Sequence, residues 1–244
     1  MYLDSFYSQV NGRLCISTEQ ASRFAKEIAG DYNPIHDSHA RRFCVPGDLL
    51  FALILARFGL SQQMTFRFHS MVGENTNLYF QQPDDGVITV RDDADKIYLE
   101  VHRAGPSTRD ESVVTAFSRR YVAFSGFNFP HYLKPLMKSH GVMFHPQRPL
   151  VIYDSMDISL ETLDLQDAQL EFTGSSLDVD GKRADAHLEF AMTSDGAAIG
   201  KGSKKLIISG LRPYDEEAMG GTVKEFFRLR STYQAQKVTP VEVT

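Results

Sequence analysis

The chain has 244 residues, of which 42% are hydrophobic, so it can bury a sizeable core as one large domain or two small ones. Its formal net charge of −5 argues against nonspecific binding to nucleic acid. Two cysteines without metal or disulfide spacing, and no signal peptide or membrane span, predict a cytoplasmic protein without a membrane partner.

The first predicted helix has clear signals at both ends. Ser17 and Gln20 have the spacing of a capping box, which satisfies backbone N–H groups at a helix start. Apolar residues then recur at helical spacing until Gly30, a residue type typical of the position just after a helix end. The helix is therefore expected to end at Gly30.

A turn that carries a carboxylate and an imidazole follows at once, in the segment 30–36. Pro34 disfavours helical backbone at the residue before it, so we expect the chain to turn and to direct Asp31 and His36 into one cleft. The side-chain amide of Asn33 would hold the carboxylate or a water molecule there. The same residue types are common in ordinary surface turns, so this loop alone does not establish catalysis.

A short helix without a polar face is predicted next. Pro46 and Gly47 open it, Asp48 lies in its first turn, and every residue of 49–56 is apolar. Such a helix must be buried on all sides, yet it is far too short to span a bilayer. Its N-terminus offers backbone N–H groups to an anion, which favours proton transfer beside a polarised carbonyl group.

Five alternating segments follow this helix and predict antiparallel strands separated by turns. The segments are 64–69, 77–81, 87–91, 96–102 and 112–124. A sheet wrapped around one apolar helix is the hotdog layout, an α+β fold.

The second half repeats this order of elements. A helix-like segment at 130–140 precedes strands expected at 151–163, 170–179, 183–193 and 197–208. The segment 90–101 also resembles 179–190 at a constant shift that pairs Val90 with Val179. We therefore expect a double hotdog whose antiparallel sheets each wrap around a central apolar helix, with the second of these helices after Pro130.

The domain boundary and the C-terminal elements follow from this layout. The halves are expected at 1–126, with the polar loop, and at 127–244, without it. Lys201, Lys204 and Lys205 are predicted to form an exposed strand face. A final helix is expected over 216–231, interrupted by a pair of glycines at 220–221.

The segment 29–36 resembles the active-site signature of the MaoC-like (R)-specific enoyl-CoA hydratases, approximately Ser/Ala-Gly-Asp-x-Asn-Pro-Ile/Leu-His. Further landmarks of that family are similar to Phe43, Gly47, Phe66, Phe68 and Gly73. The resemblance covers about the first half of the chain. It implies that the second half completes the sheet and shapes an acyl tunnel.

The resemblance implies a role for three residues. Asp31 and His36 would be the catalytic pair, and the backbone N–H of Gly47 would bind a thioester carbonyl of acyl-CoA or an acyl carrier protein. Hydration of an α,β-unsaturated thioester needs a base for water, an acid for Cα and donors for the enolate oxygen. The residue types agree with that chemistry.

Three departures from the family pattern keep alternatives open. Asp48 stands where Met is common, Ser38 stands where Asp is usual, and the connection from His36 to Gly47 is shorter than usual. Asp48 would either act as a helix-capping charge or repel an oxyanion. Besides a hydratase or dehydratase of enoyl or 3-hydroxyacyl thioesters, we therefore keep a noncatalytic acyl-thioester-binding or regulatory hotdog protein and a hotdog thioesterase.

The remaining candidates concern substrate binding. Asn33, Asp48 and Arg57 are the predicted substrate-binding residues, and Arg57 belongs to a set of arginines that would bind a CoA phosphate or be simply solvated. No cofactor and no metal site are predicted, since the two histidines of the segment 36–39 are commoner as surface residues than as ligands. The oligomeric state stays open, a homodimer included.

Overall fold

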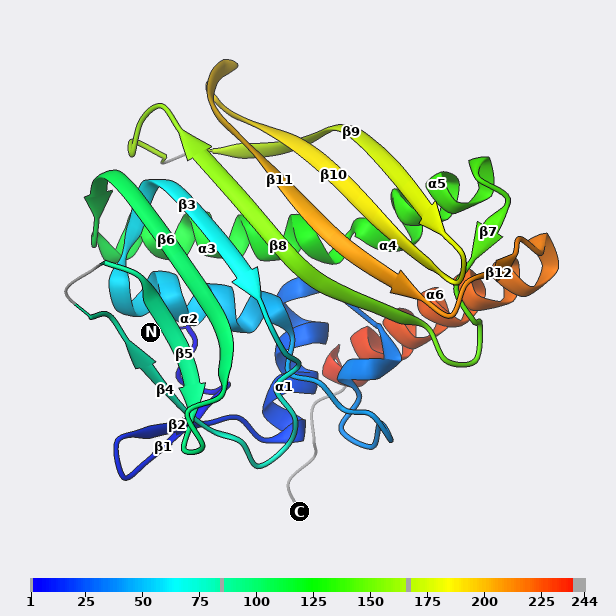
Figure 1. The fold of residues 1–244 in the computed structure, drawn as a ribbon, viewed down its shortest axis with the longest axis horizontal. Helices are drawn as coiled ribbons and strands as arrows, with labels where there is room; N and C mark the ends of the chain where they lie inside the picture. The colour runs from blue at the N-terminus through cyan, green and yellow to red at the C-terminus, as the bar shows by residue number, and fades with distance from the viewer. Residues whose placement is uncertain (1, 84–85, 166–167, 239–244) are drawn as a thin grey trace.

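One antiparallel sheet joins the two halves of the chain (Figure 1). The computed structural model describes residues 2–83, 86–165 and 168–238. Within these residues, ten strands lie in the order β1-β2-β4-β5-β6-β3-β8-β11-β10-β9. The first-half strands are β1 (Ser8–Val10), β2 (Arg13–Cys15), β3 (Leu60–Phe68), β4 (Asn77–Gln81), β5 (Ile88–Asp92) and β6 (Ile97–Thr108). The second-half strands are β8 (Leu150–Leu160), β9 (Gln169–Asp180), β10 (Arg183–Ser194) and β11 (Ala197–Ser209).

The helices occur in groups that separate groups of strands along the chain. They are α1 (Thr18–Phe24), continued by a π-helical turn (Ala25–Ala29), a 3₁₀ turn (Pro34–His36), α2 (Gly47–Phe58), α3 (Glu111–Gly126), α4 (Asn128–His131), α5 (Leu133–Ser139) and α6 (Glu216–Val238). Helices α2 and α3 pack side by side against one face of the sheet (Figure 1). A separate two-stranded ladder joins β7 (Val142–Met143) to β12 (Arg212–Pro213).

The strand order confirms the double hotdog. β3 and β8 pair at the centre of the sheet, in a register that joins Gln63 to Ser159 and Arg67 to Ser155. Outward from this seam the first half continues with β6, β5 and β4, and the second half with β11, β10 and β9, which is the same order in each half. The boundary between 126 and 127 stays a prediction, and residues 239–244 lie outside the described part of the chain.

The central helix of the first half is buried as its sequence predicts. Each side chain from Leu49 to Leu55 is at most 2% exposed, because the sheet, α3 and the N-terminal segment surround α2. Pro46 is the residue before the helix and Gly59 ends it with a positive φ of 83°. Burial of several such side chains, at about 1.5–3 kcal/mol each, stabilises the layer between α2 and the sheet.

The prediction of a strand over 112–124 is wrong, because this segment is α3. Its buried residues recur at helical spacing: Val114, Phe117, Ser118, Tyr121, Val122 and Ser125. Asp110 caps the helix, since its carboxylate accepts hydrogen bonds from the N–H groups of Ser112 and Val113. Several β-branched and aromatic residues near the start of the segment resemble the alternating pattern of a strand. The buried residues in fact recur with the helical period of 3.6 residues.

One expectation about the second half is confirmed and another is wrong. The helix expected at 130–140 is α5, whose Leu133, Leu136 and Met137 pack in one core with side chains of β9, β10 and β11. The longer helix α3 and the short α4 precede it (Figure 1). The predicted repeat that pairs Val90 with Val179 is wrong. Val90 lies in β5 and is 0% exposed, whereas Val179 lies in β9 and is 42% exposed. By sheet order, the counterpart of β5 is β10. The halves therefore repeat in topology and not at that sequence shift.

The final helix runs through the glycines that were predicted to interrupt it, because α6 includes both Gly220 and Gly221. We found no helix in the described residues that is both long and apolar enough to cross a membrane.

We expect Gly220→Ala to raise the free energy of unfolding by roughly 0.5–1 kcal/mol, since alanine restricts the unfolded chain and favours helix. A Cβ at Gly220 would meet no atom within 4 Å. Thermal unfolding measures the change. The same substitution at Gly30, where φ is 67°, is expected to lower stability instead. A lower melting temperature for Gly220→Ala would contradict the expectation.

Candidate functional site

The loop after α1 has the conformation that its sequence predicts. Ser17 and Gln20 form the capping box, and Gly30 ends the helical segment with a left-handed φ of 67°. The N–H of Asp31 donates to the carbonyl of Ala25 at 2.8 Å, which closes the helix end. The following 3₁₀ turn then carries the chain from Asp31 back toward α2.

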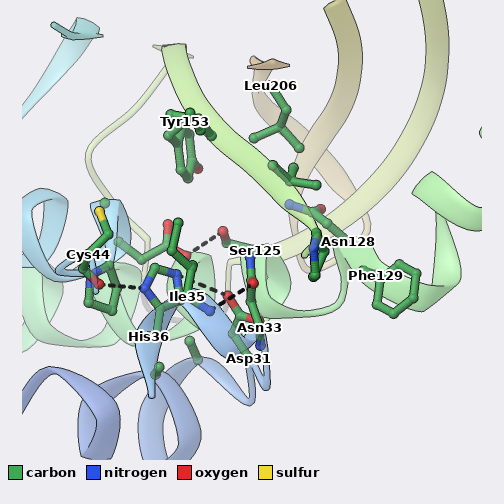
Figure 2. Close-up of a pocket in the computed structure, with 18 of the residues that line it drawn as sticks. Asp31, Asn33, Ile35, His36, Cys44, Ser125, Asn128, Phe129, Tyr153 and Leu206 are labelled. Carbon is green, nitrogen blue, oxygen red and sulfur yellow. Dashed lines mark hydrogen bonds and ion pairs between the residues drawn. The ribbon is translucent and has the colours of Figure 1, made fainter. Parts of the chain in front are cut away.

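Asp31 and His36 meet at the end of this loop (Figure 2). The distance from His36 Nε2 to Asp31 Oδ2 is 3.7 Å, which is long for a direct hydrogen bond and allows a water molecule beside the pair to contact both atoms. His36 Nδ1 lies 2.7 Å from the carbonyl oxygen of Cys44. Because that oxygen only accepts, Nδ1 carries the proton and Nε2 faces Asp31 with its lone pair in the neutral ring.

Asn33 holds the Asp31 carboxylate by its backbone and not, as predicted, by its side-chain amide. The N–H of Asn33 donates to Asp31 Oδ1 at 2.8 Å. The side-chain oxygen of Asn33 is used locally, where it accepts a hydrogen bond from the N–H of Ile35 at 3.2 Å. One oxygen of Asp31 is thus fixed and the other points toward His36.

The N-terminus of α2 opens toward the same place. Gly47 lies close to the rings of Phe68 and Tyr153, since a Cβ at Gly47 would approach them to 3.3 and 3.2 Å. As the first residue of α2, Gly47 has a backbone N–H without a partner inside the helix. That N–H can therefore donate to an anion, and the helix dipole favours negative charge there.

Asp48, next along α2, is buried and bound to the second helix of the core. Its Oδ2 accepts a hydrogen bond from Ser125 Oγ at 2.6 Å, and Ser125 Oγ in turn accepts one from Lys204 Nζ at 2.6 Å. Among the described residues, Asp48 Oδ1 has no hydrogen-bond partner. Burial raises the pKa of Asp48, and the Lys204 charge and the Ser125 hydrogen bond act in the opposite direction.

Lys204 is the residue that the sequence placed wrongly. It was predicted on an exposed face, but it is only 2% exposed and its Nζ lies 4.4 Å from the centre of the Tyr153 ring. Burial lowers the pKa of Lys204 to about 8. The signal was present in the sequence, because Lys204 has the same strand parity as Leu206 and Ile208, which are buried.

Two tyrosines close the wall beside Lys204. The hydroxyl groups of Tyr121 on α3 and Tyr153 on β8 lie 2.7 Å apart. Burial raises the pKa of both phenols well above 10. Both side chains are therefore neutral and serve as hydrogen-bonding groups.

With the exception of Tyr121, which lies behind Tyr153 in the core, these residues line one pocket of about 740 Å³. Figure 2 shows Asp31, Asn33 and His36 on one side of it, with Ser125 and Asn128 beside them and Tyr153 and Leu206 opposite. Further lining residues come from α2, β3, α4, β11 and α6, and they include Gly47, Asp48, Phe68, Phe129, Lys204 and Phe226. The pocket thus combines polar groups at the α2 end with apolar side chains farther in, and both halves contribute to it.

Arg57 does not line this pocket. It lies ten residues after Gly47, at the opposite end of α2, which corresponds to about 15 Å along the helix. Its guanidinium lies 4.9 Å from the centre of the Phe80 ring. Arg57 is therefore too far away to contact an acyl group beside Asp31, and its predicted role in binding a CoA phosphate stays a prediction.

Metal-binding chemistry has little support in the part of the chain that the structure describes, where no group of three or more His, Cys, Asp or Glu side chains is placed to hold an ion. His39 of the segment 36–39 is exposed on the surface. The pair Asp31 and His36 brings two such side chains together, which is too few for a closed metal site.

A comparison with protein families identifies the group to which this sequence belongs. The model of the family described as "Protein of unknown function (DUF3581)" matches residues 1–217, which include the whole polar loop and both sheets. The chain belongs to this family. No protein with a curated description matches it.

Three solved structures with a similar course of the chain are distant from it in sequence. The acyl-CoA thioesterase II TesB2 of Mycobacterium marinum is 11% identical, with 88% of this chain and 99% of that one covered and a TM-score of 0.44. A hot dog fold protein of unknown function from Alicyclobacillus acidocaldarius is 8% identical over 88% and 99%, with a TM-score of 0.47. A protein described as a MaoC-like dehydratase is 10% identical over 83% and 97%, with a TM-score of 0.41.

Proposed function

We propose that this member of the family adds water to an α,β-unsaturated acyl thioester, or removes it in the reverse direction. The observation that carries the proposal is the arrangement of Asp31 and His36, whose facing atoms lie 3.7 Å apart in the wall of a pocket that also includes Gly47. A base, an acid and a free helix-end N–H are the three groups that this reaction requires.

The chemistry can be written with these groups alone. A water molecule held between Asp31 Oδ2 and His36 Nε2 loses a proton to the pair as its oxygen bonds to Cβ of the substrate. The negative charge moves to the thioester oxygen, where the Gly47 N–H stabilises it. The proton then passes to Cα, which restores the thioester carbonyl and returns the pair to its starting state.

Two features support an acyl thioester as the substrate. Apolar side chains such as Phe129, Leu206 and Phe226 line the pocket beyond the polar end and suit an acyl chain. The carboxylate of Asp48, which would serve a hotdog thioesterase, has Oδ2 bonded to Ser125 and Oδ1 buried, so it is poorly placed to activate water.

The experiment is a screen of enoyl-CoA chain lengths that follows two signals in one cuvette. Hydration removes the absorbance of the conjugated thioester and releases no thiol, whereas hydrolysis releases CoA, which a thiol reagent detects. We expect loss of absorbance without free thiol. Equal rates of both signals would indicate a thioesterase, and binding of acyl-CoA without turnover at any length would indicate the noncatalytic binding protein.

A further inference from the structure

A buried chain of three polar side chains links the second half of the protein to the proposed oxyanion site. Lys204 comes from β11, Ser125 from the last turn of α3 and Asp48 from the first turn of α2. Both hydrogen bonds in the chain are 2.6 Å long, and all three residues are at most 8% exposed. Three separate elements therefore converge on one charge pair in the core.

A charge pair at this depth needs both of its members. Removing a carboxylate or an ammonium from water costs several kcal/mol, which is offset only if the partner charge stays in place. Asp48 follows Gly47 directly, so an unbalanced carboxylate would lie beside the N–H that is proposed to receive the enolate oxygen. Negative charge there would oppose the reaction.

We propose that Lys204 is a positioning residue of the site: through Ser125 its ammonium balances the charge of Asp48, so that the Gly47 end of α2 can accept the developing negative charge. The inference rests on the proposed hydration reaction. It assigns the second half of the chain an electrostatic role in a site whose reacting pair lies in the first half.

The surroundings of Lys204 contain few other charges. Asp48 and Asp31 are the two carboxylates that act on its ammonium and raise its pKa against the effect of burial. The aromatic groups that face it are Tyr153 at 4.4 Å and Tyr121 at 6.0 Å, both neutral. His36 acts on the same group of charges, since a positive charge on its ring lowers the pKa of Asp48.

The neighbouring residue Lys205 provides a matched control. It lies on the opposite face of the same strand, where its Nζ forms an ion pair of 2.7 Å with Asp185. Its Nζ also lies 3.9 Å from Oδ2 of Asp154. Lys205 itself does not line the pocket, so Lys205→Met removes one lysine charge from β11 and leaves every lining side chain in place. Lys204→Met removes the charge that balances Asp48.

The test is the dependence of kcat on pH between about 6.5 and 9 for four proteins: the wild type, Lys204→Met, the double variant Asp48→Asn/Lys204→Met, and Lys205→Met. Above pH 8 the wild type loses the Lys204 proton, so we expect kcat to fall about tenfold by pH 9. The double variant has neither charge, so its kcat is expected to be the same at pH 9 as at lower pH. At pH 9 we expect Lys204→Met to be at least about tenfold slower than the double variant. Lys205→Met should follow the wild type.

Two results would overturn the inference. The first is a double variant with the same alkaline loss of kcat as the wild type, and the second is equal rates of Lys204→Met and the double variant at pH 9. Thermal unfolding of each variant excludes a trivial loss of fold, and the double variant is expected to fold because it leaves no unpaired buried charge.

A second measurement separates failure of the inference from failure of the proposed function. NMR of protein with ¹³C-labelled lysine gives the pKa of Lys204, whose signal is the one lost in Lys204→Met. Since the Asp48 charge raises this pKa, Asp48→Asn is expected to lower it. An unchanged pKa refutes the charge pairing even in an active enzyme, whereas a wild type inert toward every enoyl-CoA refutes the hydratase.

Discussion

Replacing His36 with alanine is expected to lower kcat for enoyl-thioester hydration by about 10² to 10⁴, because a positioned proton-transfer group contributes a factor of that size. The effect on stability should be small, since His36 lies in a loop at the pocket and its ring nitrogen makes one hydrogen bond, to Cys44. The hydration assay at saturating substrate measures kcat, and the melting temperature reports the fold. Asp31→Asn is expected to give a loss of the same order.

Each of these variants has a control within the same loop. His39→Ala removes an exposed imidazole three residues away, and Asp37→Asn removes a carboxylate whose partner is Lys26 at 2.6 Å. Both controls should keep the wild-type kcat. If His36→Ala and His39→Ala were equally active, the Asp31 and His36 pair would have no part in the reaction.

Gly126→Ala is expected to be the most disruptive small substitution in the core. A Cβ at Gly126 would overlap the backbone carbonyl of Ala29, which cannot move aside as a flexible side chain would. Overpacking of this kind costs about 1–3 kcal/mol or more, which lowers the melting temperature by about 2–12 °C in a protein of this size. Thermal unfolding followed by circular dichroism measures the change.

The substitution should also reduce activity in the molecules that remain folded. Ala29 precedes Gly30 and Asp31, and Gly126 follows Ser125, so a shift at this contact moves both sides of the pocket. Gly73→Ala is the control, because a Cβ there meets no atom within 4 Å and its φ is not positive. Equal melting temperatures for the two variants would mean that the backbone at Ala29 yields without cost.

Local signals explain why the polar loop was predictable. The capping box at Ser17, the left-handed Gly30 and the turn at Pro34 each act over a few residues, so their effects can be recognised in the sequence. The burial of α2 was predictable for a similar reason, since a helix without a polar face has no surface that can lie in water.

Contacts between distant residues explain what the sequence did not reveal. Lys204 and Asp48 are joined only through Ser125, and these residues lie on three elements far apart in the chain. Lys204 has the same strand parity as Leu206, which indicates the inner face of the sheet. No local rule, however, identifies the residue that balances the charge of Lys204. The strand predicted over 112–124 also concealed the helix that carries Ser125 to α2.

The link to Lys204 changes the expected effect of substituting Asp48. If Asp48 were an unpaired carboxylate that repels an oxyanion at Gly47, removing its charge would raise turnover. As the partner of Lys204, its removal alone leaves a buried ammonium without a balancing charge. The informative change is therefore the loss of both charges together.

The two halves belong to one chain, and the pairing of β3 with β8 also joins them by hydrogen bonds in one sheet. In an assembly of separate subunits, a pocket built from both partners would be lost upon dilution below the dissociation constant. Here Lys204 is tethered to Asp48 by the chain itself, so its local concentration is independent of how much protein is present. The specific activity of the proposed hydration should therefore stay constant as the protein is diluted to nanomolar concentrations, whatever the oligomeric state.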